Sequence, residues 1–128
     1  MPDATIDVAG YTVTISGIVN PNQTVRALFE MDGQPDIQAS AIADSNGNIS
    51  GSQTLPAAGT WTIYIFLARE IEDFTVIIPG GFVGGRGVSV VSSGAGKPTR
   101  FQLGAGSIIT DKTKVNALRQ KVNLPPVQ

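Results

Sequence analysis

Two apolar segments decide the fold of this chain: Thr54-Leu-Pro-Ala-Ala-Gly-Thr-Trp-Thr-Ile-Tyr-Ile-Phe-Leu-Ala68 and Phe74-Thr-Val-Ile-Ile-Pro79. In the first segment, Trp61, Ile63, Ile65 and Leu67 alternate with Thr62, Tyr64, Phe66 and Ala68. Because successive side chains of a strand point to opposite faces, the first set is predicted to face a core. Residues 69–73 carry charges that are costly to bury, so they predict a solvated turn between two strands.

Five more short strands are predicted before this pair, at residues 4–8, 11–16, 24–31, 37–43 and 49–55. Turn signals separate them, including Asp32-Gly33 and Asp44-Ser-Asn-Gly-Asn48. The serine-rich segment 49–55 is predicted at a sheet edge. Seven short strands without a helical period indicate an antiparallel β-sandwich over residues 1–79, and a barrel is the alternative that the pattern leaves open.

The composition argues against an enzyme. The 128 residues include no Cys and no His, so the chain lacks a thiol nucleophile, the commonest general base and the commonest transition-metal ligand. No cofactor or metal is predicted. We also expect no secretory leader and no membrane span, because no apolar run approaches ~20 residues.

Charge is distributed unevenly along the chain. Residues 1–79 contain two cations and nine carboxylates, a net charge of −7, whereas residues 80–128 contain seven cations and one carboxylate, a net charge of +6. Such asymmetry is typical of a segment that makes an interaction. We therefore divide the chain into a β-sandwich (1–79) and a Gly-rich basic C-terminal arm (80–128).

The C-terminal arm has its own local patterns. Residues 88–91 and 100–103 could each form a strand, and residues 112–122 predict a short helix with Val115, Leu118 and Val122 on one stripe. Thr110 or Asp111 could cap it. An isolated helix of this length is marginal in water, so this helix needs a surface to lie on.

Three stretches resemble the bacterial immunoglobulin-like modules: Val19-Asn-Pro-Asn-Gln-Thr-Val25, Ala43-Asp-Ser-Asn-Gly-Asn-Ile-Ser50 and Ala58-Gly-Thr-Trp-Thr-Ile-Tyr-Ile65. The resemblance covers about residues 11–67 and departs from the antibody type by lacking the cysteine pair. It implies an immunoglobulin-like sandwich without a shared active site, in a family of spacers, adhesins and virion-surface domains. A lone module of this size resembles small phage proteins that decorate a capsid or build a tail.

The function predicted on this basis is that of a non-enzymatic structural protein of a phage virion, assembled in the host cytoplasm. It would dock through its C-terminal arm on capsid or tail subunits and form a homo-oligomer. The predicted interface residues are Tyr64, Phe66, Arg86, Arg100, Val115, Leu118 and Arg119. For the outward-facing Tyr64 and Phe66 a second interpretation stays open, in which the arm folds back and covers them within one subunit.

Other functions are less favoured. Nucleic acid is an unlikely partner, since the arm's cations are spread out and only Phe82 and Phe101 could stack on bases. Residues 44–48 could bind calcium but fit a hairpin turn better. The carboxylates of residues 70–73 fit a solvated turn better than a catalytic pair. The alternative function is a carbohydrate-binding or adhesion module that uses the exposed loop residues Asn20, Asn22, Asp44, Asn46 and Asn48.

Overall fold

The computed structural model describes residues 3–66, 71–78, 82–84, 99–102 and 107–127, which form two antiparallel sheets and a helix. The first sheet has the order β5-β2-β1-β9, and the second has the order β10-β7-β6-β3-β4, with β8 paired to β7. The bounds are β1 (Asp3–Ala9), β2 (Thr12–Ile18), β3 (Thr24–Glu30), β4 (Ile37–Ile42), β5 (Asn48–Thr54), β6 (Gly59–Phe66), β7 (Ile71–Ile78), β8 (Phe82–Gly84), β9 (Thr99–Gln102), β10 (Ser107–Ile109) and α1 (Lys112–Lys121).

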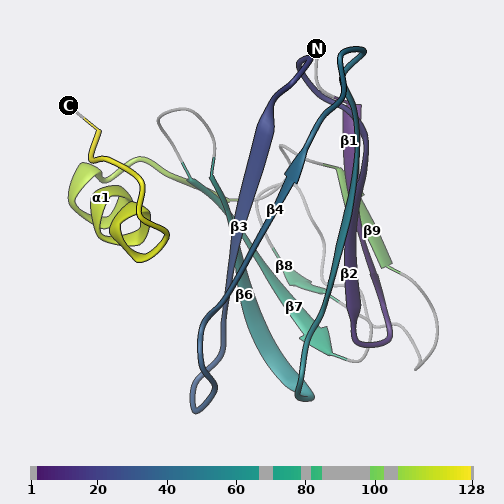
Figure 1. Cartoon of the computed structure of the whole chain (residues 1–128). Coiled ribbons are helices and arrows are strands. Elements are labelled where there is room, and N and C mark those ends of the chain that lie inside the picture. The colour runs from purple at the N-terminus through teal and green to yellow at the C-terminus, as the bar shows by residue number, and fades with distance from the viewer. Residues whose placement is uncertain (1–2, 67–70, 79–81, 85–98, 103–106, 128) are drawn as a thin grey trace.

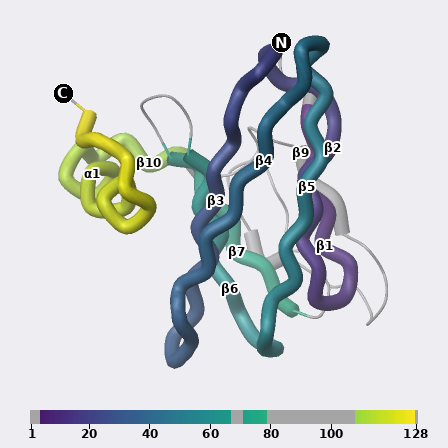
Figure 2. Tube along the Cα trace, in the orientation of Figure 1, coloured from purple at the N-terminus to yellow at the C-terminus, as the bar shows by residue number. Residues whose placement is uncertain are grey.

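The elements form three layers. The two sheets face each other, and α1 lies on the side of the β3-β6-β7 sheet that faces away from β1 and β2 (Figure 1). The tube view follows the chain from β10 directly into α1 (Figure 2). The predicted antiparallel β-sandwich with a short C-terminal helix is confirmed. The barrel alternative is wrong, because the described strands divide between two sheets.

The core between the sheets is built from the predicted alternation. Trp61, Ile63 and Ile65 of β6 are buried there, together with Phe29 of β3 and Phe74 of β7. The Trp61 indole Nε1–H donates to the carbonyl oxygen of Ala57 at 3.0 Å, so this large side chain is buried without losing a hydrogen bond. The edge prediction for residues 49–55 is also confirmed, because β5 is the end strand of its sheet.

The turn between β4 and β5 depends on one glycine. Gly47 has a φ of +89°, and a Cβ at this position would collide with the carbonyl oxygen of Val19. Its own carbonyl oxygen accepts from the N–H of Val19 at 2.8 Å. The Asn-Gly signal in the sequence therefore marks both a left-handed backbone conformation and a close approach of two chain segments.

The charged segment 69–73 differs from its prediction. β7 begins at Ile71, so Glu72 and Asp73 lie in a strand, opposite Ile65 and Tyr64 of β6. Glu72 has an exposure of 0%, and its pairing with the core residue Ile65 directs it into the sandwich. The turn prediction is therefore wrong for Glu72 and Asp73, because the apolar run of β7 extends the ladder through them. The predicted solvated position is wrong for Glu72, whereas Asp73 is partly exposed. Residues 67–70 lie outside the described residues.

The C-terminal arm contributes to both sheets. β9 pairs with β1, where Arg100 lies opposite Asp7, and β10 pairs with β7, where Ile108 lies opposite Glu72. Both ladders join residues far apart in the sequence. The predicted strand at 88–91 lies outside the described residues, whereas the one at 100–103 corresponds to β9 within one residue.

Candidate interaction surface

The helix α1 begins and ends with capping contacts that its sequence encodes. The Asp111 carboxylate accepts from the N–H of Thr113 at 3.1 Å, which confirms one of the two predicted caps. At the other end Asn123 has a φ of +61°. The N–H groups of Asn123 and Leu124 donate to the carbonyl oxygens of Gln120 and Arg119, at 3.1 and 2.9 Å. This is a Schellman motif, which satisfies carbonyl groups that the helix leaves open.

One stripe of α1 packs on the outer face of the second sheet. We call the buried residues at this contact the outer cluster: Leu28, Phe66, Ile71, Val115, Leu118 and Val122. Tyr64, Ile109, Leu124 and Val127 are partly buried around it. The buried face of α1 is thus the predicted apolar stripe. A short helix needs a surface to pack on, and here the chain's own sheet provides it.

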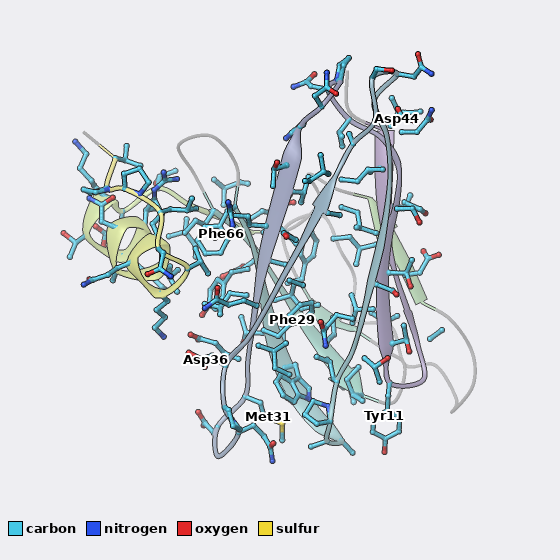
Figure 3. The ribbon with its side chains drawn as sticks, viewed as in Figure 1. Tyr11, Phe29, Met31, Asp36, Asp44 and Phe66 are labelled. Atoms are coloured by element: carbon cyan, nitrogen blue, oxygen red, sulfur yellow. The ribbon has the colours of Figure 1, made fainter. Side chains whose placement is uncertain are left out.

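Two of the predicted interface residues lie under the helix. Phe66 is 6% exposed and belongs to the outer cluster, while Tyr64 is half-buried beside it. Figure 3 shows Phe66 on the helix side of the sheet and Phe29 between the two sheets. Two interpretations were open for these aromatics. In the structure, the arm of the same chain covers them.

The other predicted residues are distributed over the arm. Val115 and Leu118 are buried in the outer cluster. The Arg119 Nε–H donates to the carbonyl oxygen of Pro125 at 2.6 Å and so holds residues 124–127 against the helix. Arg100 lies on β9, on the other sheet, so the structure does not bring it together with the helix residues. Arg86 lies outside the described residues.

The tail after α1 is tied back along the helix. The side-chain oxygen of Asn116 accepts from the N–H of Val127 at 2.7 Å, and its amide donates to the Val127 carbonyl oxygen at 3.4 Å. With the contact of Arg119 to Pro125, these bonds fix the last turn of chain on the helix. Residues 124–127 therefore lie along the helix.

A polar contact joins the C-terminal end of α1 to β3 and β4. The Lys121 ammonium lies 2.5 Å from the Glu30 carboxylate and 3.9 Å from that of Asp36, and Gln38 donates to the Lys121 carbonyl oxygen at 2.9 Å. The hydrogen bond to Glu30 raises the pKa of Lys121. Burial, followed by the charge of Glu30, raises the pKa of the nearby Tyr64 hydroxyl. Sequence reasoning missed this contact, although the opposite net charges of sandwich and arm were its signal.

Three lysines of α1 are exposed beside its buried stripe. They are Lys112, Lys114 and Lys121, and at 3.6 residues per turn they flank the stripe on its two sides instead of lying opposite to it. The helix itself contains no acidic residue, since Asp111 precedes it as the cap. Beneath the helix, burial raises the pKa of Asp73, an effect that the charge of Lys114 opposes. The structure thus uses the apolar stripe of α1 internally, places Lys114 and Lys121 near carboxylates of the same sheet, and leaves Lys112 exposed at the start of the helix.

The loop residues of the alternative function gather at one end of the sandwich. The N–H of Asn22 donates to the Asp44 carbonyl oxygen at 2.9 Å, which joins the 20–23 turn to the 44–48 turn. Asp44 lies at the end opposite to Tyr11 in Figure 3. Its carboxylate accepts from the N–H groups of Asn46 and Asn48, at 2.8 and 3.0 Å. Those bonds, with Asn48 the stronger influence, lower the pKa of Asp44. The preferred hairpin-turn interpretation is confirmed.

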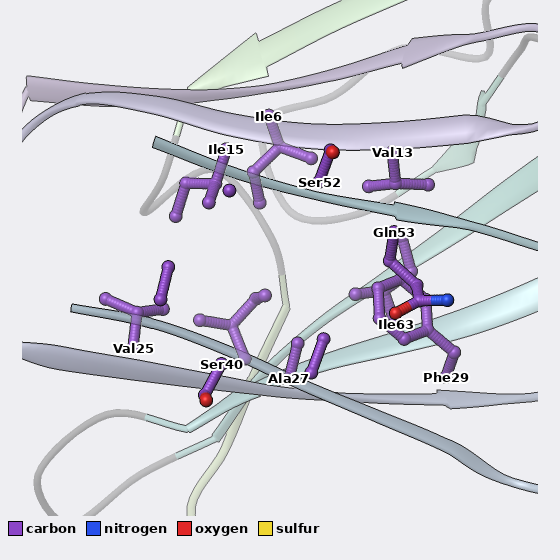
Figure 4. Close-up of a pocket in the computed structure, with 14 residues that line it drawn as sticks. Ile6, Val13, Ile15, Val25, Ala27, Phe29, Ser40, Ser52, Gln53 and Ile63 are labelled. Atoms are coloured by element: carbon purple, nitrogen blue, oxygen red, sulfur yellow. The ribbon is translucent and has the colours of Figure 1, made fainter. Parts of the chain in front are cut away.

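A small apolar cavity lies between the sheets where β4 faces β5. Its volume is about 50 Å³, and Ile6, Val13, Ile15, Phe29 and Ile63 form much of its wall (Figure 4). On the open side the wall is formed by small side chains of β3, β4 and β5, including Ala27, Ala39 and Ala41. The cavity is thus a packing gap left by alanines at the edge of the sandwich.

The described ranges contain neither a metal-binding cluster nor a helix that could span a membrane. Within residues 3–66, 71–78, 82–84, 99–102 and 107–127, no group of three or more carboxylate, imidazole or thiol side chains is placed to hold a metal ion. Over the same part of the chain, no helix has both the length and the apolar character needed to cross a bilayer. Comparisons with protein-family models, with curated proteins and with solved structures found no match to this chain.

Proposed function

We propose that this chain is a non-enzymatic structural protein of a phage virion, a capsid-decoration or tail component that docks through its C-terminal arm and displays the β-sandwich. The resemblance to bacterial immunoglobulin-like modules supports the choice of protein class. The observation that carries the docking role is the pair Lys112 and Lys114, both exposed in the first turn of α1 on a domain that is otherwise acidic.

In this proposal, the apolar residues of α1 do not contact the partner. Val115 and Leu118 are buried against the chain's own sheet, so they fix the position of the helix. A helix held in this way keeps Lys112 and Lys114 at fixed positions on the molecule. Because complementary charge mainly guides encounter and orientation, the partner surface is expected to be acidic and to add apolar contacts of its own.

Residues 1–79 should repel an acidic partner. They have a net charge of −7, of which Glu30 and Asp36 are engaged by Lys121. An acidic capsid or tail subunit would therefore approach the helix side of the molecule and avoid the loops. The sandwich would then project outward, as a displayed domain does.

The proposal is tested on particles. Purified phage particles from cells that carry this gene are probed with an antibody against the protein, by immunogold electron microscopy. Labelling at one structural position supports the proposal. In a second arm, Lys112→Glu with Lys114→Glu should remove the protein from the particles, whereas Ser50→Glu with Thr54→Glu on the distant strand β5 should not. Protein that stays entirely in the particle-free fraction contradicts the proposal.

A carbohydrate-binding or adhesion role is the second candidate, and it is favoured by the two joined turns at one end of the sandwich. Asn20, Asn22, Asn46 and Asn48 are exposed there, and amide side chains are suited to bind sugar hydroxyls. Asp44 is committed to its own turn. A glycan array probed with wild-type protein and with Asn20→Ala/Asn46→Ala protein separates the candidates. Sugar-specific binding lost in the double variant would favour adhesion.

A further inference from the structure

The edge strand β4 (Ile37–Ile42) carries the inference. Among the described strands it has one neighbour, β3, so one row of its backbone N–H and C=O groups is not used by a described strand. Proteins usually protect such an edge with a charge, a proline or a bulge. The sequence of β4, Ile-Gln-Ala-Ser-Ala-Ile, contains none of the charged or proline residues that would do so.

The side chains of β4 divide cleanly between the two faces. Ile37, Ala39 and Ala41 pack against the core, and Gln38, Ser40 and Ile42 point to the outer face. Ile42 is 70% exposed, the highest value among the large hydrophobic side chains described as exposed. An apolar residue with that exposure, on an uncharged edge, is suited to contact with another strand.

We propose that β4 pairs with β4 of a second copy of this chain, in an antiparallel arrangement about a two-fold axis. A second copy is the partner that the strand fits, because identical strands paired antiparallel are self-complementary. The inference names a surface for the homo-oligomer that the sequence predicts, and it rests on that prediction.

The pleat restricts the register. A two-fold axis normal to the sheet keeps core side chains opposite core side chains, because paired residues point to the same face. Among the positions that this rule allows, we place the axis at Ser40, near the middle of β4, which sets Ala39 opposite Ala41 and Gln38 opposite Ile42 of the second copy. An axis through Ala39 would set Ile42 opposite the charged Asp36, which we reject for that reason.

β5, the corresponding edge of the other sheet, fits less well. It is also uncharged, but Gly51 lies at its centre, where a residue without a side chain weakens a strand. Because the proposed contact uses one strand from each copy, the interface is small and the dimer is expected to be weak.

A cysteine at the proposed axis gives the most direct test. The chain has no cysteine, so Ser40→Cys introduces a single thiol. Directly opposed residues of antiparallel strands have Cα atoms about 4.5–5.5 Å apart, a separation that a disulfide accommodates. On mild oxidation of the full chain, the Ser40→Cys protein should form several-fold more linked dimer than Ser50→Cys, a matched exposed serine on β5.

A charge at the same place supplies a second readout that needs no oxidation. Ser40→Lys puts two like charges opposite each other and should keep the full chain monomeric in sedimentation at concentrations where the wild type and Ser50→Lys dimerise. Equal linking at positions 40 and 50, or equal mass for wild type and Ser40→Lys at every concentration, would overturn the inference. Ser40→Lys protein that still labels particles would leave the virion role standing without the dimer.

Discussion

Lys121 of α1 and Glu30 of β3 are 91 positions apart in the sequence, and the ammonium and carboxylate groups lie 2.5 Å apart. This contact joins the basic C-terminal arm to the acidic sandwich within one chain. It lies beside the outer cluster, so a polar and an apolar contact hold the same helix. The opposite charges of the two segments are therefore partly an internal feature of the fold.

The ion pair should stabilise the protein only slightly. Its side chains are 47% and 23% exposed, and exposed pairs contribute roughly 0.2–1 kcal/mol. We expect Glu30→Gln to lower the free energy of unfolding by about 0.5 kcal/mol at neutral pH and low salt. A double-mutant cycle with Lys121→Met, measured by urea unfolding, isolates the pair.

The pair also predicts a pH dependence. Because the pKa of Lys121 is raised in the folded state, its contribution is complete below the unfolded value of about 10.4 and is lost as the pH rises through the folded pKa. The coupling energy should therefore be unchanged from pH 7 to pH 9 and should decline above about pH 10. A coupling that declines between pH 7 and pH 9 would contradict this assignment.

The outer cluster should contribute far more. Leu118 is 5% exposed, and a buried leucine changed to alanine costs roughly 2–5 kcal/mol. We expect Leu118→Ala to lower the stability by about 2–4 kcal/mol, measured by urea unfolding with far-ultraviolet circular dichroism. Ala117→Ser, an exposed change on the adjacent helix position, should stay within about 0.5 kcal/mol of the wild type. Equal stability of the two variants would mean that α1 is not docked as described.

The 44–48 turn should be sensitive to acid. The pKa of Asp44 is lowered by the N–H groups of Asn48 and Asn46, so its contribution is present above the unfolded pKa of about 3.9 and is lost as the pH falls through the folded value. Asp44→Asn should therefore unfold at a lower temperature than the wild type at pH 7, with a smaller difference near pH 3. Asp32→Asn in the β3–β4 turn is the charge-matched control, and a larger difference at pH 3 than at pH 7 would sink the assignment.

The cavity predicts opposite changes in stability for two substitutions. Ala27 lines it from β3, so Ala27→Val should fill part of the gap and add about 1 kcal/mol of stability, since a buried methylene contributes about 0.8 kcal/mol. Gly51→Ala adds a methyl group to the opposite wall of the cavity, but that group would lie 2.9 Å from the Cβ of Ala41. This substitution should therefore lower the stability of the protein. Thermal unfolding of both variants checks the pair, and stabilisation by Gly51→Ala would show that the described wall is wrong.

The sequence predicted the parts of the fold in which apolar side chains recur at a regular spacing. The alternation of Trp61, Ile63 and Ile65 against Tyr64 and Phe66 assigned both faces of β6, because a strand has only two sides. The helix followed from its apolar spacing in the same way, and cap chemistry left Thr110 and Asp111 as alternatives, of which the structure has Asp111.

What the sequence did not predict depends on contacts between distant segments. Leu28 shares one face of β3 with the charged residues Arg26 and Glu30, so the sequence pattern indicates a solvated face there. Only the docked helix makes Leu28 a core residue. Glu72 was assigned to a turn by its charge, whereas the ladder with β6 places it inside the sandwich. In both cases tertiary pairing overrides the local signal.

The central claim is that the arm folds back and that α1 is held on its own sheet. Hydrogen exchange of the full chain, at a concentration where it is monomeric, tests this most directly, because a free helix of ten residues is marginal in water and would exchange rapidly. The account predicts that amides in the second half of α1, from Asn116 to Lys121, are protected to a degree similar to those of β6. Exchange of these amides at the rate of an unstructured peptide, with β6 still protected, would contradict it.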